Sequence, residues 1–172
     1  FPYQPKGIWL SPWSGKDWVI SKGDDKYRRA VYTYWKRTAA YPAMLTFDVP
    51  VREVCTSRRI RTNTPLQALV TLNDESYIEM ARVFAWLMQD NAKTAEEQIA
   101  WGYQRATYKA ASPQLVQAMM KLYNESLVHF KKDKDKTCEM VGITGKRNHP
   151  ESAAMVVVAN ALLNLDELIT KN

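Results

Sequence analysis

The sequence predicts an all-α protein, an irregular bundle of about six helices that follows long irregular N-terminal segments. Two observations support this fold class. Only six of the 172 residues are glycine, whereas alanine, leucine, glutamine, lysine and methionine, which favour helices, are common. Apolar side chains also recur at spacings of three and four residues, the period of one helical face. At this length we expect one domain with a sizeable core.

The first element is an extended lead-in, residues 1–23, where three prolines and three glycines interrupt regular structure. A helix is then expected to start at Asp24 or Asp25, either of which can cap it. The apolar face of this helix would consist of Tyr27, Ala30, Val31, Tyr34 and Trp35. Pro42 and Pro50 bracket a second irregular stretch, which we expect no helix to cross.

The later helices are predicted from cap residues, some of them followed by proline at the first helical position. These signals are Thr64-Pro65-Leu66-Gln67, Asn73-Asp74 before a helix to about Gln89, Thr94 with Glu97, and Ser112-Pro113. The run KKDKDK, residues 131–136, is expected to be a solvated helix end or a loop. Pro150 opens the last helix, which we expect to be central and mostly buried. Its stripe is Met155, Val158, Leu162, Leu165 and Ile169.

The candidate site lies between Phe47 and Asp74, in FDVPVREVCTSRRIRTNTPLQALVTLND. Residues 48–61, the arginine segment, contain its charged side chains. They are Asp48, Arg52, Glu53, Arg58, Arg59 and Arg61. Guanidinium groups bind carboxylate, phosphate or sulfate through planar paired hydrogen bonds, so the arginines suit an anion site. They can equally pair with the nearby carboxylates and brace a loop. We favour the brace and keep the anion site as the alternative.

Charge and aromatic residues are concentrated towards the N-terminus. Residues 1–65 hold 12 lysines and arginines against 5 acidic residues, whereas residues 66–172 hold 12 against 13. Trp9, Trp13 and Trp18 lie in the basic part and are candidate platforms for stacking on sugars. The alternative is that these rings pack a segment of little regular structure.

Other kinds of site find little support in the sequence. His129 and His149 lie in different expected elements without the spacing of metal ligands, so we expect no metal site. Phosphate-binding loops are absent, and no nucleic-acid surface is expected. The longest apolar run, residues 153–163, is too short to span a bilayer. Cys55 is expected to be structural, and its pairing with Cys138 stays open.

Several segments in order resemble one family, the planctomycete-type PSD-one C-terminal domain of unknown function. They are PYQPKGIW, YRRAVYTYWKRT at 27–38, the stretch at 47–74, and NALLNLDELIT at 160–170. The resemblance implies that residues 1–172 are one C-terminal domain, with a helical body at 24–172, excised from a large exported bacterial protein. It would lie in the periplasm or at the cell surface.

The resemblance also implies partners, namely the upstream domains of the same polypeptide, often including a c-type cytochrome. Haem would belong to that part of the parent, so no cofactor is expected in this chain. We therefore expect a non-catalytic accessory module tied to polysaccharide utilisation, although an enzyme stays open. One alternative is binding or hydrolysis of an anionic or sulfated saccharide at the arginine segment. The other is docking of a cytochrome domain through the basic N-terminal third.

Overall fold

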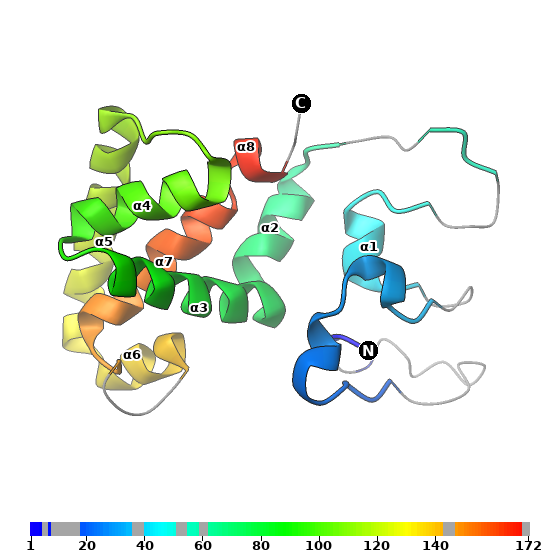
Figure 1. Ribbon diagram of the computed structural model, residues 1–172. Coiled ribbons are helices and arrows are strands. Elements are labelled where there is room, and N and C mark those ends of the chain that lie inside the picture. The colour runs from blue at the N-terminus through cyan, green and yellow to red at the C-terminus, as the bar shows by residue number, and fades with distance from the viewer. Residues whose placement is uncertain are drawn as a thin grey trace. The chain divides into compact units, whose positions relative to one another are not determined.

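The computed structural model describes residues 1–4, 7, 18–35, 40–50, 55–58, 62–142 and 147–169. Every regular element within these ranges is a helix, and none is a strand, so the predicted all-α class is confirmed. The chain divides into two compact units (Figure 1). The N-terminal unit comprises residues 1–67, and the helical unit comprises residues 68–172.

The regular elements of the N-terminal unit are short. They are the 3₁₀ helices η1 (Gly23–Tyr27) and η2 (Ala30–Tyr32) and the α-helix α1 (Pro42–Thr46). The longer helix predicted from Asp24 or Asp25 is therefore wrong. Tyr27 is 56% exposed and Val31 is 75% exposed, so positions expected to form a packed apolar face lie largely in solvent. A helix rich in aromatic and β-branched residues depends on such packing, because its intrinsic propensity is low.

Helix α1 occupies the first part of the stretch between Pro42 and Pro50 and ends at Thr46, so no helix crosses that stretch, as predicted. Pro42 occupies the first helical turn, where its missing N–H costs no hydrogen bond. Met44 of this helix is buried. The chain leaves the helix within two residues of Thr46, because Asp48 adopts a φ of 58°, in the left-handed region.

In the described part of the chain seven helices follow, and the first, α2, crosses the boundary between the units. They are α2 (Pro65–Asn73), α3 (Glu75–Asn91), α4 (Ala95–Thr107), α5 (Pro113–Lys132), α6 (Lys134–Val141), α7 (Pro150–Leu163) and α8 (Asp166–Ile169). Their starts confirm the predicted caps. Asp74 accepts a backbone N–H at the start of α3, Thr94 and Glu97 form a complete capping box on α4, and Ser112 caps α5.

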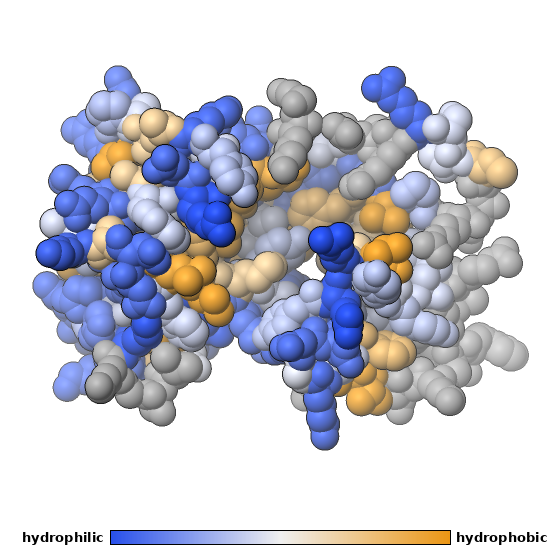
Figure 2. All heavy atoms as spheres, viewed as in Figure 1, coloured by the Kyte–Doolittle hydropathy of each residue, from blue (hydrophilic) through white to orange (hydrophobic). Residues whose placement is uncertain are grey.

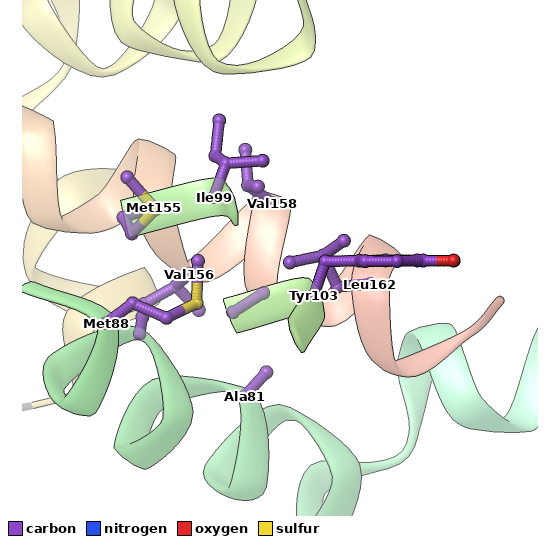
Figure 3. Packing of buried hydrophobic residues seen from close by; sticks show 10 residues of the cluster. Ala81, Met88, Ile99, Tyr103, Met155, Val156, Val158 and Leu162 are labelled. Atoms are coloured by element: carbon purple, nitrogen blue, oxygen red, sulfur yellow. The ribbon is translucent and has the colours of Figure 1, made fainter. Parts of the chain in front are cut away.

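Helix α7 lies at the centre of the helical unit, as its apolar sequence predicts. It packs against α3, α4, α5 and α6. Met155 and Val158 on this helix are fully buried. The core around them (Figure 3) comprises Ala81, Ala85, Met88, Ile99, Tyr103, Met155, Val156, Val158, Ala159 and Leu162. Partly buried side chains from α4 and α5 also pack against this core.

Two details of the helical unit differ from the predictions. The charged run at 131–136 is not only a helix end, because Asp133 accepts the Lys136 N–H and starts the separate helix α6. That helix ends at Gly142, whose φ is 73°. The last helix also stops earlier than its apolar stripe suggests. Asn164 caps α7, and α8 follows as a separate short helix.

Candidate functional site

The structure describes three residues of the predicted site, Asp48, Arg58 and Trp18. The remaining predicted residues lie outside the described part of the chain: Arg52, Glu53, Arg59, Arg61, Trp9 and Trp13. The described part of the site therefore comprises Asp48 at the start of the arginine segment, Arg58 within it, and Thr62, which follows its last residue.

Asp48 uses its carboxylate to hold the end of the arginine segment. Its Oδ2 atom accepts hydrogen bonds from the backbone N–H of Thr62 at 2.9 Å and from the Thr62 hydroxyl at 2.7 Å. The same oxygen lies 3.3 Å from Nε2 of Gln67. Bonds to a carboxylate are among the stronger hydrogen bonds in proteins. Asp48 and Thr62 are 14 positions apart, so these bonds join two parts of the N-terminal unit that are distant in the sequence.

Gln67 is the buried centre of this arrangement, with only 1% of its surface exposed. Its Oε1 accepts the Thr64 N–H at 3.1 Å, while Thr64 Oγ1 accepts the Gln67 N–H at 3.3 Å, which confirms the predicted capping box. Its Nε2 donates to the Thr46 carbonyl at 2.9 Å and to the Thr62 hydroxyl at 3.0 Å. One side chain thus joins the end of α1, the residues after the arginine segment and the start of α2.

We call Thr46, Asp48, Thr62, Thr64 and Gln67 the hub. Its hydrogen bonds form a brace at the base of the loop, but a carboxylate and an amide build it. Arg58 lies on the exposed surface, and no described residue accepts a hydrogen bond from it. The part of the brace assigned to Arg52, Arg59 and Arg61 stays a prediction, because these residues lie outside the described ranges.

Trp18 takes part in the packing of the N-terminal unit. Its indole N–H donates to the Pro2 carbonyl at 2.9 Å. Its ring stacks on Tyr41, with centroids 5.8 Å apart and planes inclined by 6°, and meets the Phe1 ring edge-on at 5.0 Å. Tyr41 is itself anchored, since its hydroxyl donates to the Tyr3 carbonyl at 2.8 Å. One face of Trp18 is therefore already covered, which weakens its case as a platform for sugar rings.

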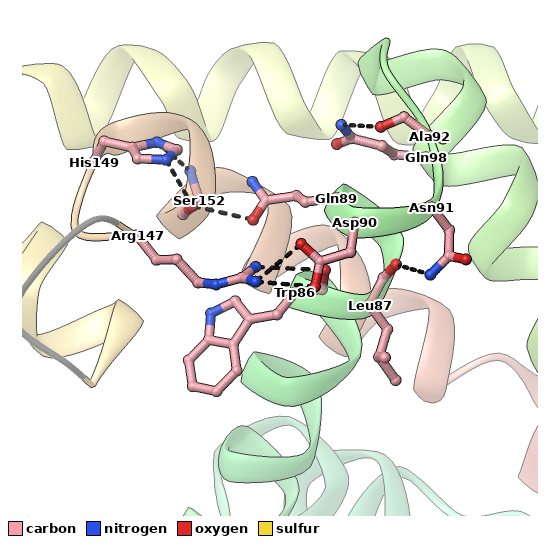
Figure 4. Close-up of polar contacts among 10 residues, drawn as sticks. All are labelled: Trp86, Leu87, Gln89, Asp90, Asn91, Ala92, Gln98, Arg147, His149 and Ser152. Atoms are coloured by element: carbon pink, nitrogen blue, oxygen red, sulfur yellow. Dashed lines mark hydrogen bonds and ion pairs between the residues drawn. The ribbon is translucent and has the colours of Figure 1, made fainter.

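A second polar cluster, at the start of α7, was not predicted (Figure 4). His149 is the N-cap residue of α7, and its Nδ1 accepts the Ser152 N–H at 3.2 Å. The Ser152 hydroxyl lies 3.2 Å from Nε2 of His149 and 3.1 Å from Oε1 of Gln89 on α3. The available sequence signal was His149-Pro150, which follows the same cap-then-proline pattern as Ser112-Pro113.

The turn before α7 is held to α3 by Arg147. Its Nη2 lies 2.9 Å from both carboxylate oxygens of Asp90, and its guanidinium lies 5.7 Å from the centre of the Trp86 ring. The pair is partly exposed, with 35% of the Arg147 side chain in solvent. A pair of this kind contributes little stability, but together with His149 it fixes where α7 begins.

Glu151, His149 and Ser152 contain the groups of a hydrolytic triad, since Oε2 of Glu151 lies 3.2 Å from Nδ1 of His149. Two observations argue against nucleophilic chemistry. Ser152 is fully buried, and its hydroxyl proton is directed to the Gln89 carbonyl oxygen. A general base would have to accept that proton. This cluster therefore caps a helix.

Other chemistry is sparse in the part of the chain that the structure describes. No three side chains of histidine, cysteine, aspartate or glutamate come together there as a metal site. Cys55 is exposed and Cys138 is partly buried, and both are free thiols. Among the described helices, none has the length and apolar character needed to cross a membrane.

A family model described as PSD1, protein of unknown function (DUF1553), matches residues 1–123. This range contains the N-terminal unit with its hub, helices α2, α3 and α4, and the first part of α5. Comparisons with curated proteins and with solved structures returned no match.

Proposed function

This chain belongs to the PSD1 family of proteins of unknown function, and on that premise we propose that it is a non-catalytic accessory module of a larger exported bacterial protein. In this proposal it docks against the upstream domains of the same polypeptide. The exported location and the companion domains rest on the sequence resemblance. The structural support comes from one observation, the inverted polarity of helix α2.

Helix α2 buries polar side chains and exposes leucines. Gln67 is 1% exposed and Thr71 is 4% exposed. Leu66 is 57% exposed, Leu69 is 58% exposed and Leu72 is 41% exposed. A helix at the surface of a complete domain has the opposite arrangement, with its apolar stripe inside. We call these three leucines the leucine face.

Hydrogen bonds account for the orientation of α2. The Thr71 hydroxyl donates to the Ala68 carbonyl at 3.0 Å. It also forms a hydrogen bond with the side chain of Asn164, the residue that follows α7. Asn160 of α7 donates to the Leu72 carbonyl at 3.1 Å. Within the helical unit, these polar contacts keep Thr71 on the buried side of the helix. The leucine face is left in solvent.

Helix α3 carries a second exposed apolar stripe beside its core-facing one. Met80 is 45% exposed, and Val83 and Leu87 are each 46% exposed. They recur at spacings of three and four residues and therefore share one side of the helix. Figure 2 shows apolar side chains at the surface of the helical unit between hydrophilic ones. Exposed apolar side chains in such number are typical of protein contact surfaces.

The test is binding of residues 1–172 to the remaining domains of the parent polypeptide, produced separately and titrated by calorimetry. The double variant Leu69→Glu, Val83→Glu should weaken binding at least about tenfold, since buried apolar contacts are replaced by charges. The matched control is Val128→Glu on α5, because Val128 is 53% exposed and lies outside both faces. The proposal fails if the double variant binds like the unmodified chain while both retain the same melting temperature.

A second candidate function is the binding of an anionic or sulfated saccharide, and the exposed Arg58 favours it. Its guanidinium is available to an external anion. A thermal-shift series with sulfate and with a sulfated polysaccharide should show stabilisation that Arg58→Ala removes. Equal shifts for Arg58→Ala and the unmodified chain would exclude Arg58 from such a site. Docking of a cytochrome domain stays a prediction from the basic N-terminal third.

A further inference from the structure

The imidazole ring of His149 lies between two groups that require opposite protonation states. Its Nδ1 is 3.2 Å from the backbone nitrogen of Ser152 and 3.2 Å from Oε2 of Glu151. The Ser152 N–H donates to the His149 carbonyl at 3.0 Å and bonds to Nδ1 only while Nδ1 keeps a lone pair, whereas the Glu151 carboxylate needs a proton there. A single ring nitrogen cannot serve both at once.

The neighbouring contacts fit the neutral ring with its proton on Nε2. In that tautomer Nδ1 accepts the Ser152 N–H, and Nε2–H donates to the Ser152 hydroxyl at 3.2 Å. That hydroxyl then donates onward to Oε1 of Gln89 at 3.1 Å. Each donor in this series of hydrogen bonds has an acceptor, and the series connects the first turn of α7 to α3. The Glu151 carboxylate is the one group in this arrangement that gains nothing from the neutral ring.

We propose that His149 is a proton-operated cap on α7. When the ring is neutral it accepts the Ser152 N–H and closes the first turn. When the ring takes up a proton, Nδ1 becomes a donor, turns to the Glu151 carboxylate and releases the Ser152 N–H. The Ser152 N–H then keeps only its bond to the His149 carbonyl at 3.0 Å. Because Ser152 is fully buried, solvent does not readily replace the lost bond, so the first turn of α7 loosens.

The balance between the two states follows from the charges around this helix end. A positive ring at a helix N-terminus is opposed by the helix dipole, and Glu151 offsets that repulsion. Arg147 and Asp90, from the preceding turn and α3, pair with each other. From α5, Tyr123 is near Glu151, and burial together with this carboxylate raises the pKa of the Tyr123 phenol.

Helix α6 also packs against α7 and carries charged side chains of both signs, Lys134, Asp135, Lys136 and Glu139. Among the described residues none of them forms a hydrogen bond or an ion pair with His149. Histidine is the side chain that ordinarily changes charge between about pH 5 and 8. The cap should therefore be closed while the ring is neutral and open once acid protonates it.

The experiment is a pH titration of the whole 172-residue chain by ¹H–¹⁵N NMR, following the Ser152 amide and the His149 ring nitrogens together. The two signals should move in one shared transition. Protection of the Ser152 amide from hydrogen exchange, corrected for the intrinsic pH effect, should fall about fivefold or more at low pH, the scale of one helix cap. A Ser152 amide that does not follow the ring would overturn the proposal.

Three variants test which residue causes the change at Ser152. His149→Asn keeps a good cap residue that does not titrate, so the transition at Ser152 should vanish while α7 stays folded. Glu151→Gln removes the carboxylate that stabilises the charged ring, so the loss of protection at a given low pH should be smaller. His129→Gln removes the other histidine of the chain and should change nothing at Ser152. Persistence of the transition in His149→Asn would also overturn the proposal.

Discussion

The substitution Gln67→Leu tests the hub most directly. Leucine is close to glutamine in volume but carries no polar atom. The change therefore keeps the buried volume and removes the hydrogen bonds that Gln67 makes through Oε1 and Nε2, which reach Thr46, Asp48, Thr62 and Thr64. What it measures is the contribution of one buried amide to the closure of the loop.

The expected loss of stability in Gln67→Leu is the sum of the contributions of the hydrogen bonds that disappear. Each intramolecular hydrogen bond contributes about 1 kcal/mol net, and more when its partner is left buried and unpaired. The Thr64 N–H and the Thr46 carbonyl lie in partly buried surroundings, so their loss counts fully. Asp48 and Thr62 keep the hydrogen bonds between them and can bond to water in place of Gln67. Their loss of Gln67 therefore adds little to the destabilisation. The sum is about 2–3 kcal/mol, or roughly a 30- to 140-fold rise in local opening.

The assay is hydrogen exchange measured by mass spectrometry on peptides covering residues 41–50 and 62–70. Both should exchange faster in Gln67→Leu by that factor. A matched control is Gln98→Leu, because Gln98 makes one side-chain bond, to the Ala92 carbonyl at 3.2 Å. It should raise exchange only near the start of α4, by about fivefold. Less than a threefold change at residues 41–50 in Gln67→Leu would refute the role given to the hub.

Three further predictions concern helix ends. Gly142→Ala should destabilise the chain by about 1–2 kcal/mol in urea titrations, because an alanine there is strained and its Cβ would lie 2.8 Å from the Arg82 guanidinium. In an Arg82→Ala background the steric clash disappears, so the destabilisation should be smaller. A hydrogen bond from Lys109 lowers the pKa of Glu167, so stability from this carboxylate is present at neutral pH and lost in acid. Melting temperatures should accordingly be lower for Glu167→Gln at pH 7 and converge with the unmodified chain as pH falls. Asp133→Ala should speed exchange in α6, and since a backbone N–H lowers the pKa of Asp133, this effect should also fade in acid.

Helix starts were predictable because their causes are local. Thr94 and Glu97 bond to backbone atoms no more than four residues away, and the sequence alone places them within reach. The predicted helix containing Tyr27 and Val31 failed for the opposite reason. Its spacing was helical, but a packed surface for that face depends on the rest of the molecule. Asp133 was overlooked because a run of mixed charges conceals a local cap signal.

The candidate site was predictable only in outline. The charged run drew attention to Asp48, and the structure shows this carboxylate tied to Thr62. The second role of Gln67 was not foreseeable, because its Nε2 meets Thr46 and Asp48, which lie 21 and 19 positions away in the chain. His149 had a local signal in the proline that follows it, although histidine is not among the residues usually preferred as caps.

The proposed function rests mainly on the inverted polarity of α2, which buries Gln67 and Thr71 and exposes leucines. Burying a leucine side chain fully is favourable by about 1.5–3 kcal/mol relative to leaving it fully exposed. The three leucines are about half exposed, so each of them lacks part of that stabilisation. The buried Gln67 and Thr71 do not compensate for it, because hydrogen bonds of neutral groups contribute about 1 kcal/mol each. Under the proposed function, an apolar surface of another domain covers these leucines. The recognition surface of the chain would then lie on α2 and α3.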